Sequence, residues 1–151
     1  MHLITETLLV GNIYDAKAPP LNIGALLLVA AEYTLESPDG LPSGRIPFSE
    51  YAEAKPLLLD RAVSWVERHM SERRVMVCCR AGIGRSVSVV MAYLCCVEGM
   101  TYTETLKLVT ERRPGAMPLP NLKEAITQVC LLREARAAGK KTRASRPATT
   151  V

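Results

Sequence analysis

Apolar residues along the chain fall into two kinds of pattern. Continuous apolar runs at residues 25–29 and 75–78 have the length of buried strands. Residues 57–70 instead place apolar side chains at helical spacing, with charged side chains between them. We expect further short strands at 3–5, 8–10 and 45–48, a loop at 32–44, and further helices at 12–17, 86–98, from Thr101 or Thr103 to Arg113, and at 121–138. Strands separated by helices predict an α/β sandwich with its functional site at the strand ends.

Composition supports one globular domain. The chain has 151 residues, of which 48% are apolar and 23% charged. No apolar run approaches the roughly 20 residues of a membrane span. The first residues do not form a basic segment followed by an apolar core, so we expect no signal peptide. The expectation is therefore a cytoplasmic, monomeric protein that does not bind a membrane.

The net charge of +4 comes from the end of the chain. Residues 139–151 carry Lys140, Lys141, Arg143 and Arg146 and no acidic residue, and without these four the chain has 15 basic and 15 acidic residues. Such basic tails are usually solvated. We therefore expect a domain over 1–138 followed by a disordered tail over 139–151, and no nucleic-acid partner.

The five cysteines do not suggest a disulfide framework or a metal site. They stand at 78, 79, 95, 96 and 130, as two adjacent pairs and a single residue, without the Cys-x2-Cys spacing of a zinc site. Cys95 and Cys96 lie in an expected helix and are interpreted as core residues. A reducing cytosol is the expected compartment.

Residues 74–87 carry the candidate chemistry. An apolar strand leads into a short segment with Gly82 and Gly84, and a helix-compatible stretch follows. A strand, a glycine-bearing loop and a helix direct several backbone N–H groups and the positive end of the helix dipole at one point. The two glycines suit a loop that needs positive φ or close backbone approach. This segment therefore predicts an anion-binding site.

Two side chains give that anion site a reactive character. Cys79 stands at the strand end and Arg85 follows six residues later. A thiol beside a guanidinium and a helix N-terminus is expected to be a thiolate near neutral pH, and arginine binds phosphate through two parallel hydrogen bonds. The pair predicts attack on phosphorus and a phosphocysteine that water hydrolyses. Ser86 is placed to donate a hydrogen bond to the departing sulfur.

The segment 79–86 reads Cys-x-Ala-Gly-x-Gly-Arg-Ser and resembles the signature loop of the protein tyrosine phosphatase superfamily, in the form found in small dual-specificity phosphatases. The resemblance covers roughly residues 8–132. It implies an α/β fold with a central, mostly parallel sheet flanked by helices, and a reaction that needs no metal or organic cofactor. It also implies that the phosphate-binding residues are Arg80, Ala81, Gly82, Ile83, Gly84 and Arg85.

The resemblance also implies a carboxylic acid that protonates the leaving oxygen and later activates water. The family carries an Asp in a frame like Ile-Pro-x-x-Asp, and Glu50 holds that position in residues 46–50. Glu53 is a rival three residues on. Asp39, which precedes a glycine, is a second rival, although a turn role explains it fully.

Three departures from the family pattern predict weaker turnover. Cys78 replaces the histidine that usually precedes the nucleophile, which favours activity shifted to higher pH. Glu50 replaces the Asp and changes the reach of the acid. Ala125 stands at the position of a glutamine in the following helix, where the family positions water.

These residues predict a cysteine-dependent phosphatase that hydrolyses phosphotyrosine and phosphoserine or phosphothreonine in proteins. No segment resembles the deep phosphotyrosine-selecting loop of the larger phosphatases. A pseudophosphatase that binds phosphoproteins is the first alternative, because of the substitutions at 50, 78 and 125. A phosphatase for lipid or carbohydrate phosphates is disfavoured by Ile83, where lysines are typical. A redox or sulfur-transfer protein using Cys78 and Cys79 is the third alternative.

Overall fold

The computed structural model describes residues 1–36, 40–71 and 73–145, and side chains as far as residue 141. Its strands are β1 (His2–Leu3), β2 (Leu8–Gly11), β3 (Ala25–Leu28), β4 (Ser43–Arg45) and β5 (Val75–Cys78). Its helices are α1 (Ile13–Lys17), α2 (Pro56–His69), α3 (Arg85–Cys96), α4 (Tyr102–Arg112) and α5 (Leu122–Ser145). None of the helices in these ranges is long and apolar enough to cross a membrane.

The five strands form one sheet in the order β1-β2-β5-β3-β4. All neighbouring pairs are parallel except β1 and β2 at one edge. The central strand, β5, is fully buried, as its continuous apolar run predicts. The predicted α/β fold with a mostly parallel sheet is therefore confirmed.

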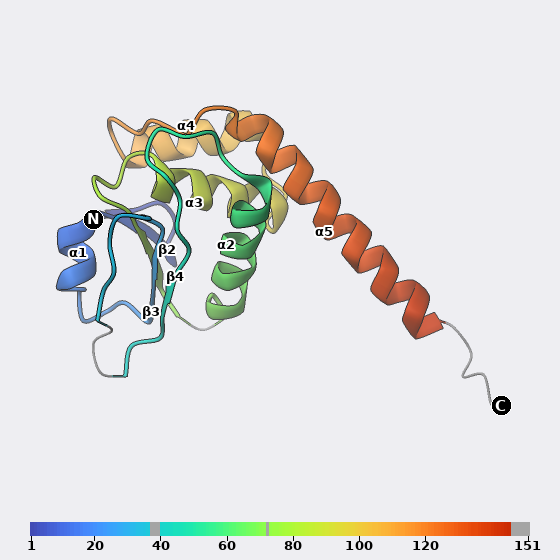
Figure 1. The fold of residues 1–151 in the computed structure, drawn as a ribbon, viewed down its shortest axis with the longest axis horizontal. Helices are drawn as coiled ribbons and strands as arrows, with labels where there is room; N and C mark the ends of the chain where they lie inside the picture. Colours follow the sequence, from blue (N-terminus) through green and yellow to red (C-terminus); the bar gives the residue numbers. More distant parts are fainter. Residues whose placement is uncertain (37–39, 72, 146–151) are drawn as a thin grey trace.

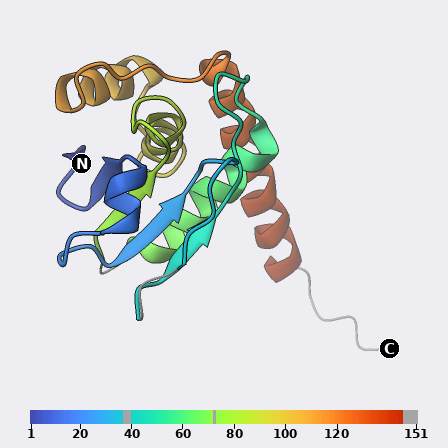
Figure 2. The ribbon, with the colours of Figure 1, turned by 60° about the vertical axis from the view of Figure 1, so that its left-hand side comes forward.

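Helices cover both faces of the sheet. In Figure 1, α1 lies on one face, and α2 and α3 lie on the other, with α4 and α5 outside α3. Figure 2, turned by 60°, shows the same layers and the long α5 that runs along the outside of α2. The core lies between the sheet and α2 and α3, and includes Leu27, Val63, Val77 and Val90.

The register of the sheet brings three strand ends together. Cys78, the last residue of β5, pairs with Gly11 at the end of β2 and with Leu28 at the end of β3. Because the strands are parallel, the segments that follow them meet at the same edge. The loop after Cys78 therefore leaves the sheet between two other loops, which can supply partners for its residues.

Two predicted boundaries were wrong. The fourth strand is β4, not residues 45–48, because the last pair with β3 is Leu28 with Arg45, and the Phe48 N–H donates to Ile46 O at 3.1 Å instead of to β3. The last helix does not end near Ala138 but continues to Ser145, through the first part of the basic segment that was expected to be disordered. Residues 146–151 lie outside the described residues, so the rest of that expectation stays a prediction.

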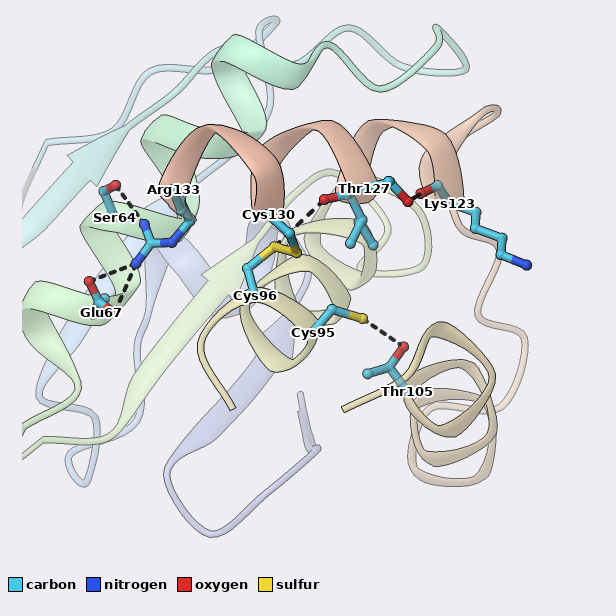
Figure 3. The surroundings of a disulfide bond; sticks show 10 residues. Ser64, Glu67, Cys95, Cys96, Thr105, Lys123, Thr127, Cys130 and Arg133 are labelled. Atoms are coloured by element: carbon cyan, nitrogen blue, oxygen red, sulfur yellow. Dashed lines mark hydrogen bonds and ion pairs between the residues drawn. A yellow bond between two sulfur atoms is a disulfide. The ribbon is translucent and has the colours of Figure 1, made fainter. Parts of the chain in front are cut away.

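The interpretation of the cysteines was wrong in one respect. Cys96 at the end of α3 and Cys130 in α5 form a disulfide, shown in Figure 3. The same figure shows Arg133 of α5 directed at Ser64 and Glu67 of α2, with hydrogen bonds of 3.2 and 2.9 Å. A covalent bond and an ion pair thus hold α5 to the helical layer. Cys78, Cys79 and Cys95 are free thiols.

Candidate active site

The phosphate loop, defined as residues 79–86, begins at the carboxyl end of the central strand. Cys79 is buried, and its N–H donates to Gly11 O at 3.2 Å. Its Sγ lies 3.3 Å from Ser86 Oγ, which is also buried. The structure therefore brings the predicted nucleophile and the predicted hydrogen-bond donor for its sulfur into contact.

The loop needs glycine at two positions for different reasons. Gly82 has φ +71°, and a Cβ there would lie 2.9 Å from Gly11 O, which is too close for a side chain. Gly84 has negative φ, and a Cβ there would lie 3.3 Å from Met117 O, a tight contact. The sequence analysis expected positive φ or close backbone approach at these glycines. Gly82 shows both features, and Gly84 shows close approach alone.

The backbone of the phosphate loop presents N–H groups without partners. None of the N–H groups of residues 80–84 donates to another group in the described part of the chain. The carbonyl oxygens of the same five residues all accept hydrogen bonds from surrounding segments. In a trans peptide, the C=O of one residue and the N–H of the next point in opposite directions. The bonds to these carbonyls therefore turn the N–H groups of residues 81–84 away from those segments. Such a set of N–H groups can bind an anion.

Arg85 is held by a residue that the sequence analysis did not name. Its side chain is 3% exposed, and its Nη1 and Nη2 donate to the two carboxylate oxygens of Glu32 at 2.6 and 2.5 Å. Nη1 also donates to Phe48 O at 3.0 Å. These bonds use three of the five N–H groups of a guanidinium and leave the Nε–H and one Nη2–H, which lie on one edge. That edge can bind phosphate through two hydrogen bonds.

Charge favours the ionised form of both partners. The hydrogen bonds from Arg85 lower the pKa of the Glu32 carboxyl, although partial burial acts in the opposite sense. Burial acts to lower the pKa of Arg85, but the hydrogen bond and charge of Glu32 outweigh it and raise that pKa. Glu32 follows β3, the strand beside β5. An acidic residue just after this buried strand was the sequence signal that could have identified it as the partner of Arg85.

Glu50 lies at the same site, paired with the phosphate loop. Arg80 donates its Nε to Glu50 Oε1 at 3.0 Å, and its Nη2 contacts the same oxygen. This hydrogen bond and the carboxylate charge raise the pKa of Arg80, which is exposed. The next residue, Tyr51, has φ +60° and is largely exposed. Of the two rivals, Glu53 is exposed and does not line the cavity, and Asp39 lies outside the described residues.

A cavity of about 280 Å³ joins these groups. Cys79, Arg85, Arg80 and Glu50 contribute its polar lining. The rest of the wall comes mainly from apolar side chains and backbone, namely Tyr51, Ala81, Ile83, Gly84, Met117, Pro118, Leu119 and Pro120. The structure therefore places around one volume the three residues that the sequence analysis proposes as nucleophile, phosphate clamp and acid, Cys79, Arg85 and Glu50.

The other two departures from the family pattern lie outside this cavity. Cys78 is fully buried, and burial raises the pKa of its thiol well above the ordinary value. Ala125 lies on α5 and is 1% exposed, so its side chain packs in the core. Neither residue lines the cavity.

Comparison with known proteins decides the family. The family model described as the catalytic domain of dual specificity phosphatases matches residues 15–130, more than half of the chain. The chain belongs to the dual specificity phosphatase family. The resemblance in the sequence is therefore confirmed.

Individual relatives match over different lengths. The chain is 28% identical to dual specificity protein phosphatase 1B of Arabidopsis thaliana, over 83% of this chain and 78% of that protein. It is 33% identical to mouse (Mus musculus) dual specificity protein phosphatase 8 over 49% of this chain, but it spans only 12% of the length of that relative. A solved structure of a mouse dual specificity phosphatase complexed with zinc tungstate has the same fold, with a TM-score of 0.77, 23% identity and coverage of 90% and 89% of the two chains.

Proposed function

We propose that this chain hydrolyses phosphomonoesters through a phosphocysteine formed at Cys79. The observation that supports it most is the pairing of a buried Cys79 Sγ with N–H groups of residues 80–84 that have no partner in the described chain. The free edge of Arg85 faces no protein acceptor either, in the described ranges. A thiolate and an anion cradle lining one cavity suit phosphoryl transfer better than thiol redox chemistry.

In the first step, the phosphate oxygens bind the loop N–H groups and the Nε and Nη2 of Arg85. The Cys79 thiolate attacks phosphorus, so a sulfur–phosphorus bond forms while the bond to the ester oxygen breaks. The leaving oxygen takes a proton from the carboxyl group of Glu50. Charge on the transferring group is stabilised by donors that are already in place, which is the largest contribution expected of such a site.

In the second step, water attacks the phosphocysteine. Glu50, now a carboxylate, takes a proton from the water, and the phosphorus–sulfur bond breaks to give inorganic phosphate and the thiolate. The Ser86 hydroxyl, 3.3 Å from the sulfur, donates a hydrogen bond to the departing thiolate. The cycle then returns every group to its starting state.

The Arg80–Glu50 pair has to open during this cycle. Glu50 accepts two hydrogen bonds from Arg80 in the structure, whereas the first step needs its carboxyl group to carry a proton taken from solvent and to turn toward the leaving oxygen. The phosphate of a substrate can compete for Arg80 and release Glu50, because both lie at the cavity. The Arg80–Glu50 pair is therefore formed in the resting protein and broken in the reacting complex.

We further propose that the substrates are phosphorylated proteins carrying phosphotyrosine and phosphoserine or phosphothreonine. Support comes from the family and from the apolar walls of the cavity, which suit the side chain that carries the phosphate. A monomeric state, and the absence of nucleic-acid or membrane partners, stay predictions. A cytoplasmic location also stays a prediction, and the Cys96–Cys130 disulfide weighs against it because disulfides are rare in reducing compartments.

A phosphoprotein-binding pseudophosphatase is the second candidate. It is favoured by the ion pair between Glu50 and Arg80, which keeps the proposed acid in contact with the phosphate loop. It is also favoured by Cys78 and Ala125, which supply no polar group to the cavity. It is opposed by the complete set of Cys79, Arg85 and Ser86.

Hydrolysis of an aryl phosphate across pH separates the two candidates. We expect wild-type activity that disappears in Cys79→Ser and that loses its acid-dependent limb in Glu50→Gln. Glu53→Gln, a change to an exposed carboxylate outside the cavity, is the matched control and should behave as wild type. If wild type shows no turnover above Cys79→Ser while both bind vanadate, the chain is a binding module and the catalytic proposal fails.

A further inference from the structure

The phosphate loop is held from outside by one segment of the chain more than by any other in the described ranges. The carbonyl oxygens of five consecutive loop residues accept six hydrogen bonds in the described ranges, and three of the six come from the segment after α4. The bonds are Ile13 N to Arg80 O at 3.1 Å, Arg113 Nη2 to Ala81 O at 3.4 Å, Arg113 Nε to Gly82 O at 3.1 Å, Met117 N to Ile83 O at 2.7 Å, and Ser88 N and Ser88 Oγ to Gly84 O at 2.9 and 2.7 Å.

Arg113 is the only side chain among the described residues that donates to two of these carbonyls. It is the C-cap residue of α4, where its own N–H donates to Val109 O at 2.8 Å. Its Nη1 also donates to Pro114 O at 2.5 Å, so the guanidinium is fixed on three sides. Arg113 does not line the cavity that contains Cys79. Its action on a bound anion therefore has to pass through the loop.

The two carbonyls belong to the peptide groups on either side of Gly82. In a trans peptide, the Ala81 C=O is opposed to the Gly82 N–H, and the Gly82 C=O is opposed to the Ile83 N–H. Glycine has the lowest barrier to rotation of its flanking peptides, because no Cβ restricts φ and ψ. A rotated peptide would direct a carbonyl oxygen, instead of an N–H, toward a bound phosphate. The orientation of two of the cradle's donors therefore depends on what holds their carbonyls.

We propose that Arg113 is a positioning residue that fixes the Gly82 and Ile83 N–H groups toward the phosphate. The inference rests on the proposed function, since it assigns those N–H groups to the phosphoryl group. A planar guanidinium can bridge two neighbouring carbonyls with hydrogen bonds at fixed angles, whereas an ammonium group is a single point donor. Because the role is geometric, Arg113 substitutions should weaken binding most for an anion that accepts hydrogen bonds from all the loop N–H groups at once, as the transition state does.

Orthovanadate and inorganic phosphate provide the two probes. Vanadate bound to a cysteine thiolate mimics the five-coordinate transition state, whereas phosphate mimics the ground state. The full chain is prepared as wild type, Arg113→Met, Arg113→Lys and Arg112→Met, and the affinity for each anion is measured by titration calorimetry at one pH. Arg112 is the exposed neighbour of Arg113 and serves as the matched control.

We expect Arg113→Met to weaken vanadate binding roughly ten- to a hundredfold, as for the loss of a preorganised donor, and phosphate binding by a smaller factor. Arg113→Lys should recover part of the vanadate affinity, and Arg112→Met should match wild type. The melting temperatures of all four proteins are measured beside the affinities. A fall in affinity for vanadate beyond that for phosphate, with unchanged melting, would support positioning over a general structural role.

The opposite results are distinguishable. If wild type binds vanadate and Arg113→Met binds it equally well, Arg113 does not position the loop, and the proposed function is untouched. If wild type itself binds no vanadate, the proposed function and this inference both fail. Should Arg113→Met not fold, Arg113→Lys decides: affinity for vanadate below wild type supports the role, and affinity equal to wild type overturns it.

Discussion

The two halves of the candidate site are built differently. The phosphate loop is held to its surroundings by hydrogen bonds, and the side chain of Arg85 is 3% exposed with three hydrogen bonds. The acid segment, defined as residues 46–54, carries Glu50 with a 30% exposed side chain, whose partner within the described ranges is a single arginine. The fold thus fixes the proposed nucleophile and anion cradle, whereas the proposed acid is held by one ion pair that can exchange partners.

This difference fits the chemistry proposed for each half. Stabilising charge on a transferring phosphoryl group requires donors that do not reorganise. Delivering a proton to the leaving oxygen and later taking one from water requires a group that can turn. Substitutions in the phosphate loop should therefore cost much more activity than substitutions in the partner of the acid.

The largest effect is expected for Arg85→Lys. A lysine has no planar guanidinium, so it cannot bind Glu32 through one edge and phosphate through another. Both the hydrogen bonds to Glu32 and those to phosphate are therefore lost. We expect kcat/KM for an aryl phosphate to fall about a thousandfold. Arg61→Lys, at an exposed position of α2, is the matched control and should not change it. Activity of Arg85→Lys within a few-fold of wild type would contradict the assignment of the clamp.

Gly82→Ala should have the next largest effect. A Cβ at this position would lie 2.9 Å from Gly11 O at φ +71°, so the loop has to shift. We expect activity to fall roughly a hundredfold, as for a misplaced catalytic group. Gly99→Ala is the comparison, because Gly99 has φ +74° but no atom within 4 Å of a Cβ.

Gly99→Ala should lower the free energy of unfolding by about 1 kcal/mol through backbone strain and leave activity unchanged. Denaturant unfolding and steady-state kinetics on both variants check the pair. Equal losses of activity in Gly82→Ala and Gly99→Ala would show that the packing of the phosphate loop on Gly11 is not what matters.

Glu32→Gln should have a smaller effect and a diagnostic pH dependence. A glutamine leaves Arg85 without its carboxylate partner, and we expect kcat/KM to fall about tenfold. Because the pKa of Glu32 is lowered in the folded protein, its ionised form stabilises the fold above its ordinary pKa of 4.5, and this contribution is lost as pH falls through the lower, folded value.

Thermal unfolding between neutral pH and pH 3 measures this loss. Wild type should lose more stability over that range than Glu32→Gln, which has no carboxyl group to protonate. Parallel curves for the two proteins would show that the Glu32–Arg85 pair does not contribute.

The smallest effect is expected for Arg80→Met. Removing Arg80 frees Glu50 from its ion pair but also removes a cation beside the cavity, so the two effects on turnover oppose each other. We expect kcat/KM to change only a few-fold, in line with an exposed ion pair. The pH profile for Glu50-dependent turnover is measured beside wild type. A loss as large as that of Arg85→Lys would show that the acid half is as rigidly specified as the phosphate loop.

The same division explains what the sequence could predict. Residues 79–86 are contiguous, so their strand, loop and helix context and their chemistry could be interpreted together. Continuous apolar runs predicted β3 and β5 because both are buried on both faces. Glu50 could be placed from its distance to Ile46-Pro47, although its pairing with Arg80 could not.

Contacts between distant segments were missed. Glu32 contacts Arg85 across 53 residues, and the Cys96–Cys130 disulfide joins α3 and α5 across 34. Nothing in the local pattern around either pair specifies the partner, because these contacts depend on how the helices and strand ends pack. The strand expected at 45–48 was misplaced for a related reason: the buried Ile46 and Phe48 look like a strand but pack in a loop.

Trapping the covalent intermediate tests the central claim most directly. The Ser86→Ala variant, which lacks the hydroxyl 3.3 Å from Cys79 Sγ, should break down its intermediate slowly. Denaturing it during turnover of an aryl phosphate and mapping the chain by mass spectrometry should locate one phosphoryl group on Cys79. An unmodified Cys79, together with a Cys79→Ser variant that still hydrolyses the ester at the wild-type rate, would contradict the account.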